Sequence, residues 1–273
     1  MSYASIAVFV EADGVPEARV RLAAALADKF TSTLIGVSAR VIPPPMVADG
    51  VVVGVPSEAD IKRMQASLAE KGVWFRRIAG GAERKLDWRS DFDFPNAVLA
   101  REARAADLVV IGRSTPLGSP YSSLDPGEAV LKMGRPTLVV PGPAAALRAE
   151  HAVIGWKDTR EARRAVRDAL PLLQQATRIT IVEACRPDEE QTSLARLDDV
   201  VRYLARHRVA GGAKVMLEQK GSGAAQLIEV AQAERADLLV TGAYGHSRLG
   251  EWMFGGTTRE LLATSPICCL MSH

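Results

Sequence analysis

The sequence has few cysteines, no marked excess of charge of either sign and no long apolar run. Three cysteines in 273 residues, two of them adjacent, exclude a disulfide framework and are typical of a reducing compartment. Thirty-four basic residues against 32 acidic ones leave a net charge of +2, too little to attract nucleic acid or a membrane surface. No stretch reaches the roughly 18 apolar residues of a membrane span, and residues 1–6 lack the features of a signal peptide. We therefore expect a cytoplasmic protein that binds neither nucleic acid nor membrane.

Several motifs of enzymes and metal sites are missing as well. The four histidines are scattered without metal-ligand spacing, and neither a Gly-x-x-x-x-Gly-Lys-(Ser/Thr) loop nor a Gly-x-Ser-x-Gly elbow occurs. Residues 221–226 imitate a dinucleotide fingerprint, but Gln226 stands where its third glycine is required. We predict no catalytic residue and no metal site, although weak ATPase activity stays open.

The sequence does contain an alternation of apolar runs and amphipathic segments that occurs twice. The strands expected in the first half are residues 6–10, 33–37, about 73–78, 107–112 and 136–140, with helices at 16–29, 58–71, 95–105 and 125–133. Those expected in the second half are 152–156, 178–182, 214–217, 237–242 and 266–271, with helices at 160–174, 191–208, 224–234 and from 257 onward. Prolines in 42–56 and charges in 80–94 predict irregular loops.

The two halves also repeat individual residues in register. The motif Glu-Ala-Arg occurs at residues 17–19 and again at 161–163. Three further pairs lie 130 positions apart: Asp107 and Asp237, Gly112 and Gly242, and Pro136 and Pro266. Strands that alternate with helices predict a parallel sheet with right-handed crossovers in each half. We therefore expect two α/β domains of one plan, at residues 1–143 and 150–273.

The clearest binding motif lies near the end of the second half. A buried strand runs into a glycine-rich turn, and a second glycine pair then precedes two threonines and a helix. The residues concerned are Gly242, Gly245, Gly255, Thr257 and Thr258. Glycine lets a ligand approach the backbone, and a helix N-terminus offers free N–H groups to an anion. Because open α/β sheets bind ligands at the carboxyl ends of their strands, the motif predicts a phosphate cradle for a nucleotide.

This pattern, Gly242-x-x-Gly245 followed after nine residues by Gly255, resembles the nucleotide loop of the universal stress protein family in its tandem form. The resemblance implies two Rossmann-like α/β/α sandwiches of the adenine-nucleotide-alpha-hydrolase type, each with a five-stranded, mostly parallel sheet. It implies that the last strands of the two halves pair across a pseudo-twofold axis, as a pseudo-dimer. Members act in stress survival, commonly by binding ATP or AMP, and others bind no nucleotide. Whether Mg²⁺ takes part, and whether two chains form a homodimer, stays open.

The other candidate site residues follow from where a nucleotide would lie. Trp156 and Val182 are the expected apolar walls for the base, and His246 is a charge near the phosphates. The family's acidic residue after the first strand corresponds to Asp158 only with a one-residue gap. Aligned without a gap through Glu-Ala-Arg, Asp13 falls opposite Lys157.

Two positions depart from the family's pattern. The hydroxyl that should follow the third glycine is replaced by Gly256. Thr257 or Thr258 can substitute for it, or Thr257 can form a capping box with Glu260 and leave the helix without free amides. In the first half, Asp125 stands in place of Gly255 and opens a helix with Glu128 three residues on. These carboxylates would repel phosphate, so we expect the first half to be structural.

We predict the first of two functions for this stress-response protein. The first is a sensor or regulator that binds ATP or AMP through its second domain without catalysis. The alternative is a nucleotide-free stress-response scaffold that works through protein contacts or an apolar ligand. Gly256 and Lys157 favour the alternative.

Overall fold

The computed structural model describes residues 2–48, 51–81, 84–113, 121–142, 144, 146–217, 222–245 and 256–273. In the first half, the elements are β1 (Ser5–Phe9), α1 (Glu17–Phe30), β2 (Thr33–Ala39), β3 (Met46–Ala48), β4 (Val51–Val53), α2 (Glu58–Ala79), β5 (Leu86–Asp91), α3 (Pro95–Glu102), η1 (Ala103–Ala105), β6 (Leu108–Gly112), α4 (Pro126–Lys132) and β7 (Thr137–Val140).

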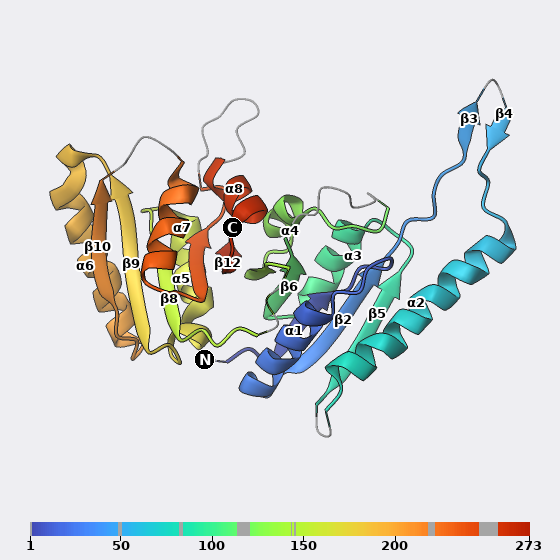
Figure 1. Cartoon of the computed structure of the whole chain (residues 1–273), viewed down its shortest axis with the longest axis horizontal. Coiled ribbons are helices and arrows are strands. Elements are labelled where there is room, and N and C mark those ends of the chain that lie inside the picture. The colour runs from blue at the N-terminus through green and yellow to red at the C-terminus, as the bar shows by residue number, and fades with distance from the viewer. Residues whose placement is uncertain are drawn as a thin grey trace.

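The second half follows the same order without a counterpart of β3 and β4 among the described residues. Its elements are β8 (His151–Gly155), α5 (Arg160–Leu173), β9 (Arg178–Cys185), η2 (Pro187–Glu189), α6 (Glu190–Arg206), β10 (Gly212–Leu217), α7 (Gly223–Ala233), β11 (Leu238–Gly242), α8 (Gly256–Thr264) and β12 (Cys268–Ser272). The long helix α2 and the hairpin β3–β4 extend away from the rest of the first half (Figure 1).

Ten strands of the described residues form one continuous sheet, five from each half, in the order β10-β9-β8-β11-β12-β7-β6-β1-β2-β5. In that part of the chain the neighbours are parallel, except that β12 and β7 are antiparallel where the halves meet. Leu270 stands opposite Leu138 at this seam, and both are fully buried. The expected fold class and the pairing of the last strands are confirmed.

Helices cover both faces of the sheet and bury two apolar cores (Figure 1). The core of one face takes side chains from α1, α2, α5 and α6, and the core of the other face takes them from α3, α4, α7 and α8. No helix in the described ranges is both long and apolar enough to cross a membrane.

The repeated aspartates have the same structural task in both halves. The Asp107 carboxylate accepts hydrogen bonds from the amides of Ala4 and Ser5, at 2.8 and 3.0 Å. The Asp237 carboxylate accepts from the amide of His151 at 3.1 Å. Each aspartate therefore ties the start of the first strand of its half to the strand beside it, which explains the repeat without a ligand.

The third strand expected in the first half, at about 73–78, is wrong. These residues belong to α2, and the strand that occupies the place is β5, in the stretch 80–94 that was expected to be a loop. Leu68, Gly72, Phe75 and Ala79 are the buried residues of α2, and their spacing of four, three and four residues is that of a helix. Trp88 of β5 packs over Gly36 and Phe75.

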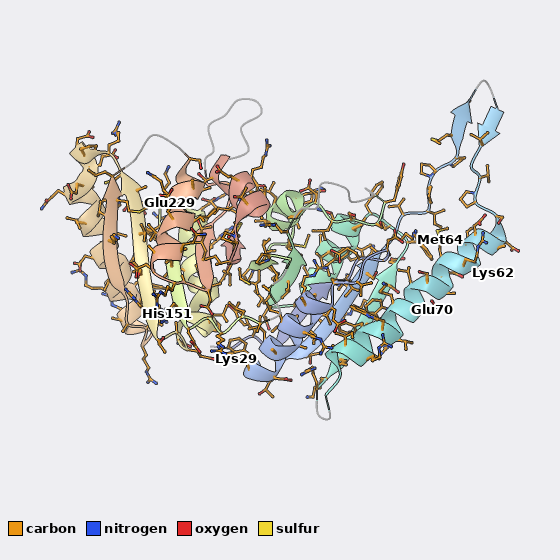
Figure 2. All side chains as sticks on the ribbon, in the orientation of Figure 1. Lys29, Lys62, Met64, Glu70, His151 and Glu229 are labelled. Atoms are coloured by element: carbon orange, nitrogen blue, oxygen red, sulfur yellow. The ribbon has the colours of Figure 1, made fainter. Side chains whose placement is uncertain are left out.

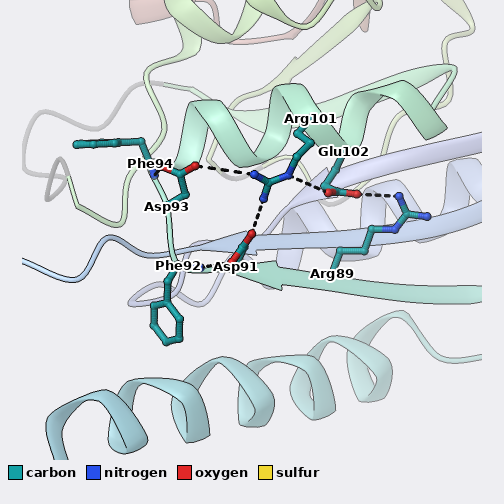
Figure 3. Close-up of polar contacts among 7 residues, drawn as sticks. All are labelled: Arg89, Asp91, Phe92, Asp93, Phe94, Arg101 and Glu102. Atoms are coloured by element: carbon teal, nitrogen blue, oxygen red, sulfur yellow. Dashed lines mark hydrogen bonds and ion pairs between the residues drawn. The ribbon is translucent and has the colours of Figure 1, made fainter. Parts of the chain in front are cut away.

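β5 carries charges because it is an edge strand with its outer side open to solvent. Arg89 pairs with Glu102 of α3 at 2.8 Å, and Arg101 pairs with Asp91 at 2.6 Å (Figure 3). These partly exposed ion pairs connect the strand to the helix and contribute little stability each. Because β5 contains charged residues and no apolar run, a search for apolar runs in the sequence does not find it.

The proline-containing segment 42–56 was expected to be irregular, and its middle forms the antiparallel hairpin β3–β4. Val47 and Val52 are cross-strand partners there and are 72% and 58% exposed. Lys62, Met64 and Glu70 lie on the projecting helix α2 next to it (Figure 2). The Lys29 ammonium (labelled in Figure 2) donates to the carbonyl of Arg148 at 2.7 Å and links α1 to the segment before β8.

Candidate functional site

The glycine turn, residues 242–245, begins where β11 ends. β11 lies between β8 and β12, and β8 pairs with β9 on its other side, so the turn stands at the switch point of the second half. Tyr244 adopts a positive φ of 58°, which is uncommon for a residue with a side chain. The backbone therefore reverses sharply at the place where such a fold accepts ligands.

Gly242 is required by the packing of α5. A Cβ at this position would lie 2.5 Å from the amide nitrogen of Ala162 and 2.7 Å from the carbonyl carbon of Glu161. Both are backbone atoms, so they cannot move aside without shifting the helix. The first glycine of the motif thus lets the N-terminus of α5 rest on the end of the strand, and a bound ligand is not needed to explain it.

Gly245 lies against two side chains from the start of α5. A Cβ there would be 3.0 Å from Glu161 Oε2 and 3.1 Å from Thr159 Oγ1. Glu161 is only 4% exposed and pairs with Arg160. Burial raises the pKa of Glu161. The hydrogen bond and charge of Arg160, a backbone hydrogen bond and a hydrogen bond from Thr159 together lower it by more, so the pKa lies below its ordinary value. An ionised carboxylate therefore stands beside the turn at neutral pH.

One amide of the turn already has a partner in the protein. The N–H of Tyr244 donates to Oγ1 of Thr258 at 3.2 Å, and Thr258 is 5% exposed. Thr257 is exposed and lies near the start of α7, where a Cβ on Gly223 would be 3.2 Å from its Oγ1. Of the two candidate hydroxyls, Thr258 is the one turned to the loop, where it completes the turn.

Glu260 connects α8 to α7. Its Oε1 accepts a hydrogen bond from the hydroxyl of Ser222 at 2.7 Å, and the same hydroxyl accepts from the amide of Ala225 and caps α7. This bond draws the N-terminal ends of the two helices together on one side of the turn. Ser222 therefore acts as a helix cap, as its sequence context indicates.

The remaining candidates are divided between two places. The amide of Trp156 donates to the carbonyl of Val182 at 2.8 Å, so both lie at the carboxyl ends of neighbouring strands, and Val182 is buried. The Trp156 side chain and Asp158 line a cavity between α5 and α6, where Asp158 pairs with Arg163 at 2.5 Å. Gly242 and Gly245 instead contact the start of α5 at Thr159–Ala162. His246 and Gly255 lie outside the described residues.

The strand register resolves the alignment of Asp158. Because Asp107 and Asp237 hold equivalent strand starts, Phe9 corresponds to Gly155, and Asp158 to Ala12. The connection from strand to helix is longer in the first half, residues 10–16, than in the second, residues 156–159. The displaced Asp13 pairs with Arg40 at 3.0 Å.

The first half closes its own equivalent of the site. A Cβ on Gly112 would collide with the guanidinium of Arg19, which is 8% exposed and pairs with Glu11. Oδ1 of Asp125 accepts from the amide of Glu128 at 2.9 Å, so the expected helix start at Asp125 is confirmed.

Two residues of the site were missed in the sequence. Glu161 was noticed only as part of a repeat, although an acidic residue two positions after the cap Thr159 signals a helix N-terminus. Tyr244 connects the halves, since a Cβ on Gly127 of α4 would be 2.7 Å from its hydroxyl oxygen. Burial, and then the charge of Asp125, raise the pKa of Tyr244 above its ordinary value.

Comparison with known proteins relates the second half of the chain to a protein family. Residues 148–273 match the model of the Universal stress protein family. A universal stress protein from Archaeoglobus fulgidus DSM 4304 has a similar structure, with a TM-score of 0.77 at 11% identity, over 98% of this chain and 95% of that chain. A putative universal stress protein from Pseudomonas aeruginosa UCBPP-PA14 gives a TM-score of 0.57 at 15% identity, over 98% and 92%. No curated protein matches the chain.

Proposed function

We propose that this chain, which has the fold of a tandem universal stress protein and whose residues 148–273 match the model of that family, is a stress-response protein that works without a bound nucleotide. In this proposal it acts as a scaffold or regulator, through protein contacts or an apolar ligand, and not as an enzyme. The observation that carries it is the buried, ionised Glu161 beside Gly245, the position where the motif would receive a phosphate.

The energies favour exclusion of phosphate. Two like unit charges about 4 Å apart repel by roughly 4 kcal/mol at an effective dielectric constant of about 20. A helix N-terminus attracts an anion by about 0.3–2 kcal/mol. Arg160 offsets part of the repulsion, but its side chain is 66% exposed and is screened by water. The amide of Tyr244, engaged with Thr258, adds nothing for a ligand.

Calorimetric titration of the purified chain with ATP, and separately with AMP, tests this proposal. We expect no saturable heat for either nucleotide up to about 1 mM, which corresponds to a binding free energy weaker than roughly −4 kcal/mol. The titrations are repeated with Mg²⁺, because Mg²⁺ binds carboxylates and phosphates together and would offset the repulsion by Glu161. Micromolar binding of either nucleotide would contradict it.

A second candidate is the binding of ATP or AMP at the glycine turn, with or without Mg²⁺. The position of the turn at the switch point favours it, as does the space beside Gly256 at the start of α8, where an added Cβ meets no atom of the described residues within 4 Å. In this case Glu161 would have to turn away from Gly245 when the phosphates bind. AMP, with less charge, should then bind more tightly than ATP, whereas the first proposal expects neither to bind.

A further inference from the structure

A cavity of about 480 Å³ lies between α5 and α6 in the second half. We call it the α5–α6 groove, and it is lined by Trp156, Asp158, Arg163, Val166, Arg167, Arg196, Asp199, Val200 and Tyr203. It is separate from the glycine turn, which contacts the first turn of α5 through Gly242 and Gly245. Its volume falls within the range of about 300–1,000 Å³ that is typical of small-molecule sites.

The inner wall of the groove is apolar. Val166 on α5 and Val200 on α6 are 2% and 6% exposed, and the rings of Trp156 and Tyr203 complete the wall. Two facing aliphatic side chains with two rings offer a lining suited to a flat or slender apolar group. A polar metabolite would lose hydration over most of this wall, where Nε1 of Trp156 is the buried donor that has no hydrogen-bond partner among the described residues.

Three arginines and two aspartates line the rim of the groove, and they differ in how they are paired. Arg163 pairs with Asp158 at 2.5 Å, and Arg196 pairs with the buried Glu183 at 2.7 Å. Asp199, the other rim carboxylate, shares Arg202 outside the groove with Asp198. Among the residues that the structure describes, Arg167 forms no ion pair, although it interacts electrostatically with the neighbouring Asp168. The groove therefore presents one available guanidinium above an apolar wall.

The first half shows that this groove is not a necessary product of the fold. Its helices α1 and α2 pack directly against each other. Trp88 stands over Gly36 there and contacts Phe75, which fills the space beneath α2. By the strand register, Ala213 and Ile181 are the counterparts of Trp88 and Gly36. The second half thus carries alanine at the position where the first half carries Trp88.

We propose that the α5–α6 groove binds a small amphipathic carboxylate. Its apolar body lies between Val166 and Val200 against Trp156, and its carboxylate forms an ion pair with Arg167. A guanidinium suits this role because it stays charged and matches the carboxylate with two parallel hydrogen bonds. This inference rests on the proposed function, since it supplies the apolar ligand through which a nucleotide-free regulator would act.

Calorimetric titration with 2-naphthoate tests the inference, with the uncharged 2-naphthamide as the matched ligand. We expect one naphthoate site per chain with a dissociation constant of about 10–100 μM, and at least tenfold weaker binding of the amide. Arg167→Gln should reduce the naphthoate affinity to that of the amide and leave amide binding unchanged. Arg206→Gln, which removes an equal charge from an exposed position of α6 outside the groove, should leave both affinities unchanged.

A variant that fills the groove locates the ligand. Val200→Trp should abolish binding of both compounds, with the far-ultraviolet circular dichroism spectrum unchanged. The inference is overturned by absence of saturable naphthoate binding up to about 1 mM, by equal affinity for naphthoate and amide, or by full binding to Val200→Trp. If nucleotide binds the wild-type chain, the proposed function fails whatever naphthoate does. If neither nucleotide nor naphthoate binds, the inference alone fails.

Discussion

The two halves share a strand plan and differ in how their helices meet above it. In both, an aspartate ties the first strand to its neighbour, and the last strand pairs at the seam. In the first half α1 packs on α2 and Trp88 fills the core, whereas in the second half α5 and α6 leave a groove. The buried strands thus preserve the fold, while the helix contacts and strand–helix connections are free to vary. Differences between the halves are therefore the best guide to function.

The seam between β7 and β12 should be the most sensitive part of the shared plan. Leu138 and Leu270 are direct partners and fully buried, so replacing either with alanine leaves a cavity in a core common to both halves. We expect Leu138→Ala and Leu270→Ala each to lower the free energy of unfolding by about 2–5 kcal/mol, measured by denaturant titration. Leu217→Ala, at a position 47% exposed on the edge strand β10, should cost less than about 0.5 kcal/mol. A large difference between the unfolding free energies of the two seam variants would show that the two halves do not contribute equally to the seam.

The equivalent glycines Gly112 and Gly242 should differ in the cost of an added methyl group. At Gly242 the methyl meets backbone atoms of α5, whereas at Gly112 it meets the movable end of Arg19. We expect Gly242→Ala to cost about 3 kcal/mol and Gly112→Ala about 1 kcal/mol, by the same denaturant titration. Gly256→Ala, where a Cβ finds open space, serves as the control with a change below about 0.5 kcal/mol. Equal costs at the first two positions would show that α5 does not rest on Gly242 as described.

The glycine turn should acquire nucleotide binding when its two obstacles are removed. Glu161→Gln removes the carboxylate beside Gly245, and Gly256→Ser places a hydroxyl where the family carries one, in space that is open. We expect the double variant to bind ATP at least tenfold more tightly than the wild-type chain, a change of about 1.4 kcal/mol or more. Calorimetry measures it, with Gly256→Ser alone as the control. An unchanged affinity would show that other residues exclude the nucleotide.

Asp168 at the meeting of the halves should give a smaller, pH-dependent effect. Its backbone carbonyl accepts from the hydroxyl of Tyr3 at 2.6 Å, and its carboxylate accepts from the hydroxyl of Ser272 at 2.8 Å. Burial raises the pKa of Asp168. The hydrogen bond from Ser272 and nearby arginines, including Arg167, lower it by less, so the pKa stays above its ordinary value. Since the folded pKa exceeds the unfolded one, ionisation of this carboxyl disfavours the fold as pH rises through the folded pKa.

Asp168→Asn keeps an acceptor for Ser272 and removes the charge. We expect a higher free energy of unfolding than the wild type at pH 7, and a difference that vanishes below the unfolded pKa of about 3.9. Denaturant titrations across this pH range measure it. A variant less stable than the wild type at pH 7 would mean that the charge is stabilised in the fold.

Much of the fold could be predicted from the sequence because buried parallel strands are nearly continuous apolar runs. The apolar run at 73–78 was wrongly predicted as a strand. Val73 and Trp74 make the run continuous, but they lie off the buried face of α2, which Gly72, Phe75 and Ala79 form at helical spacing. β5 was missed because an edge strand has charged residues and no apolar run. The glycine motif at Gly242 and Gly245 could be recognised in the sequence, but the residues that contact it in space could not. Glu161 meets Gly245 only through tertiary packing, which the local pattern does not contain.

The nucleotide content of the purified chain tests the central claim most directly. The protein is denatured with acid, and the released nucleotides are measured by mass spectrometry against the amount of protein. Because Glu161 and Thr258 occupy the glycine turn, we predict only a trace of adenine nucleotide per chain. About one equivalent of ATP or AMP per chain would contradict the account and establish the turn as a nucleotide site.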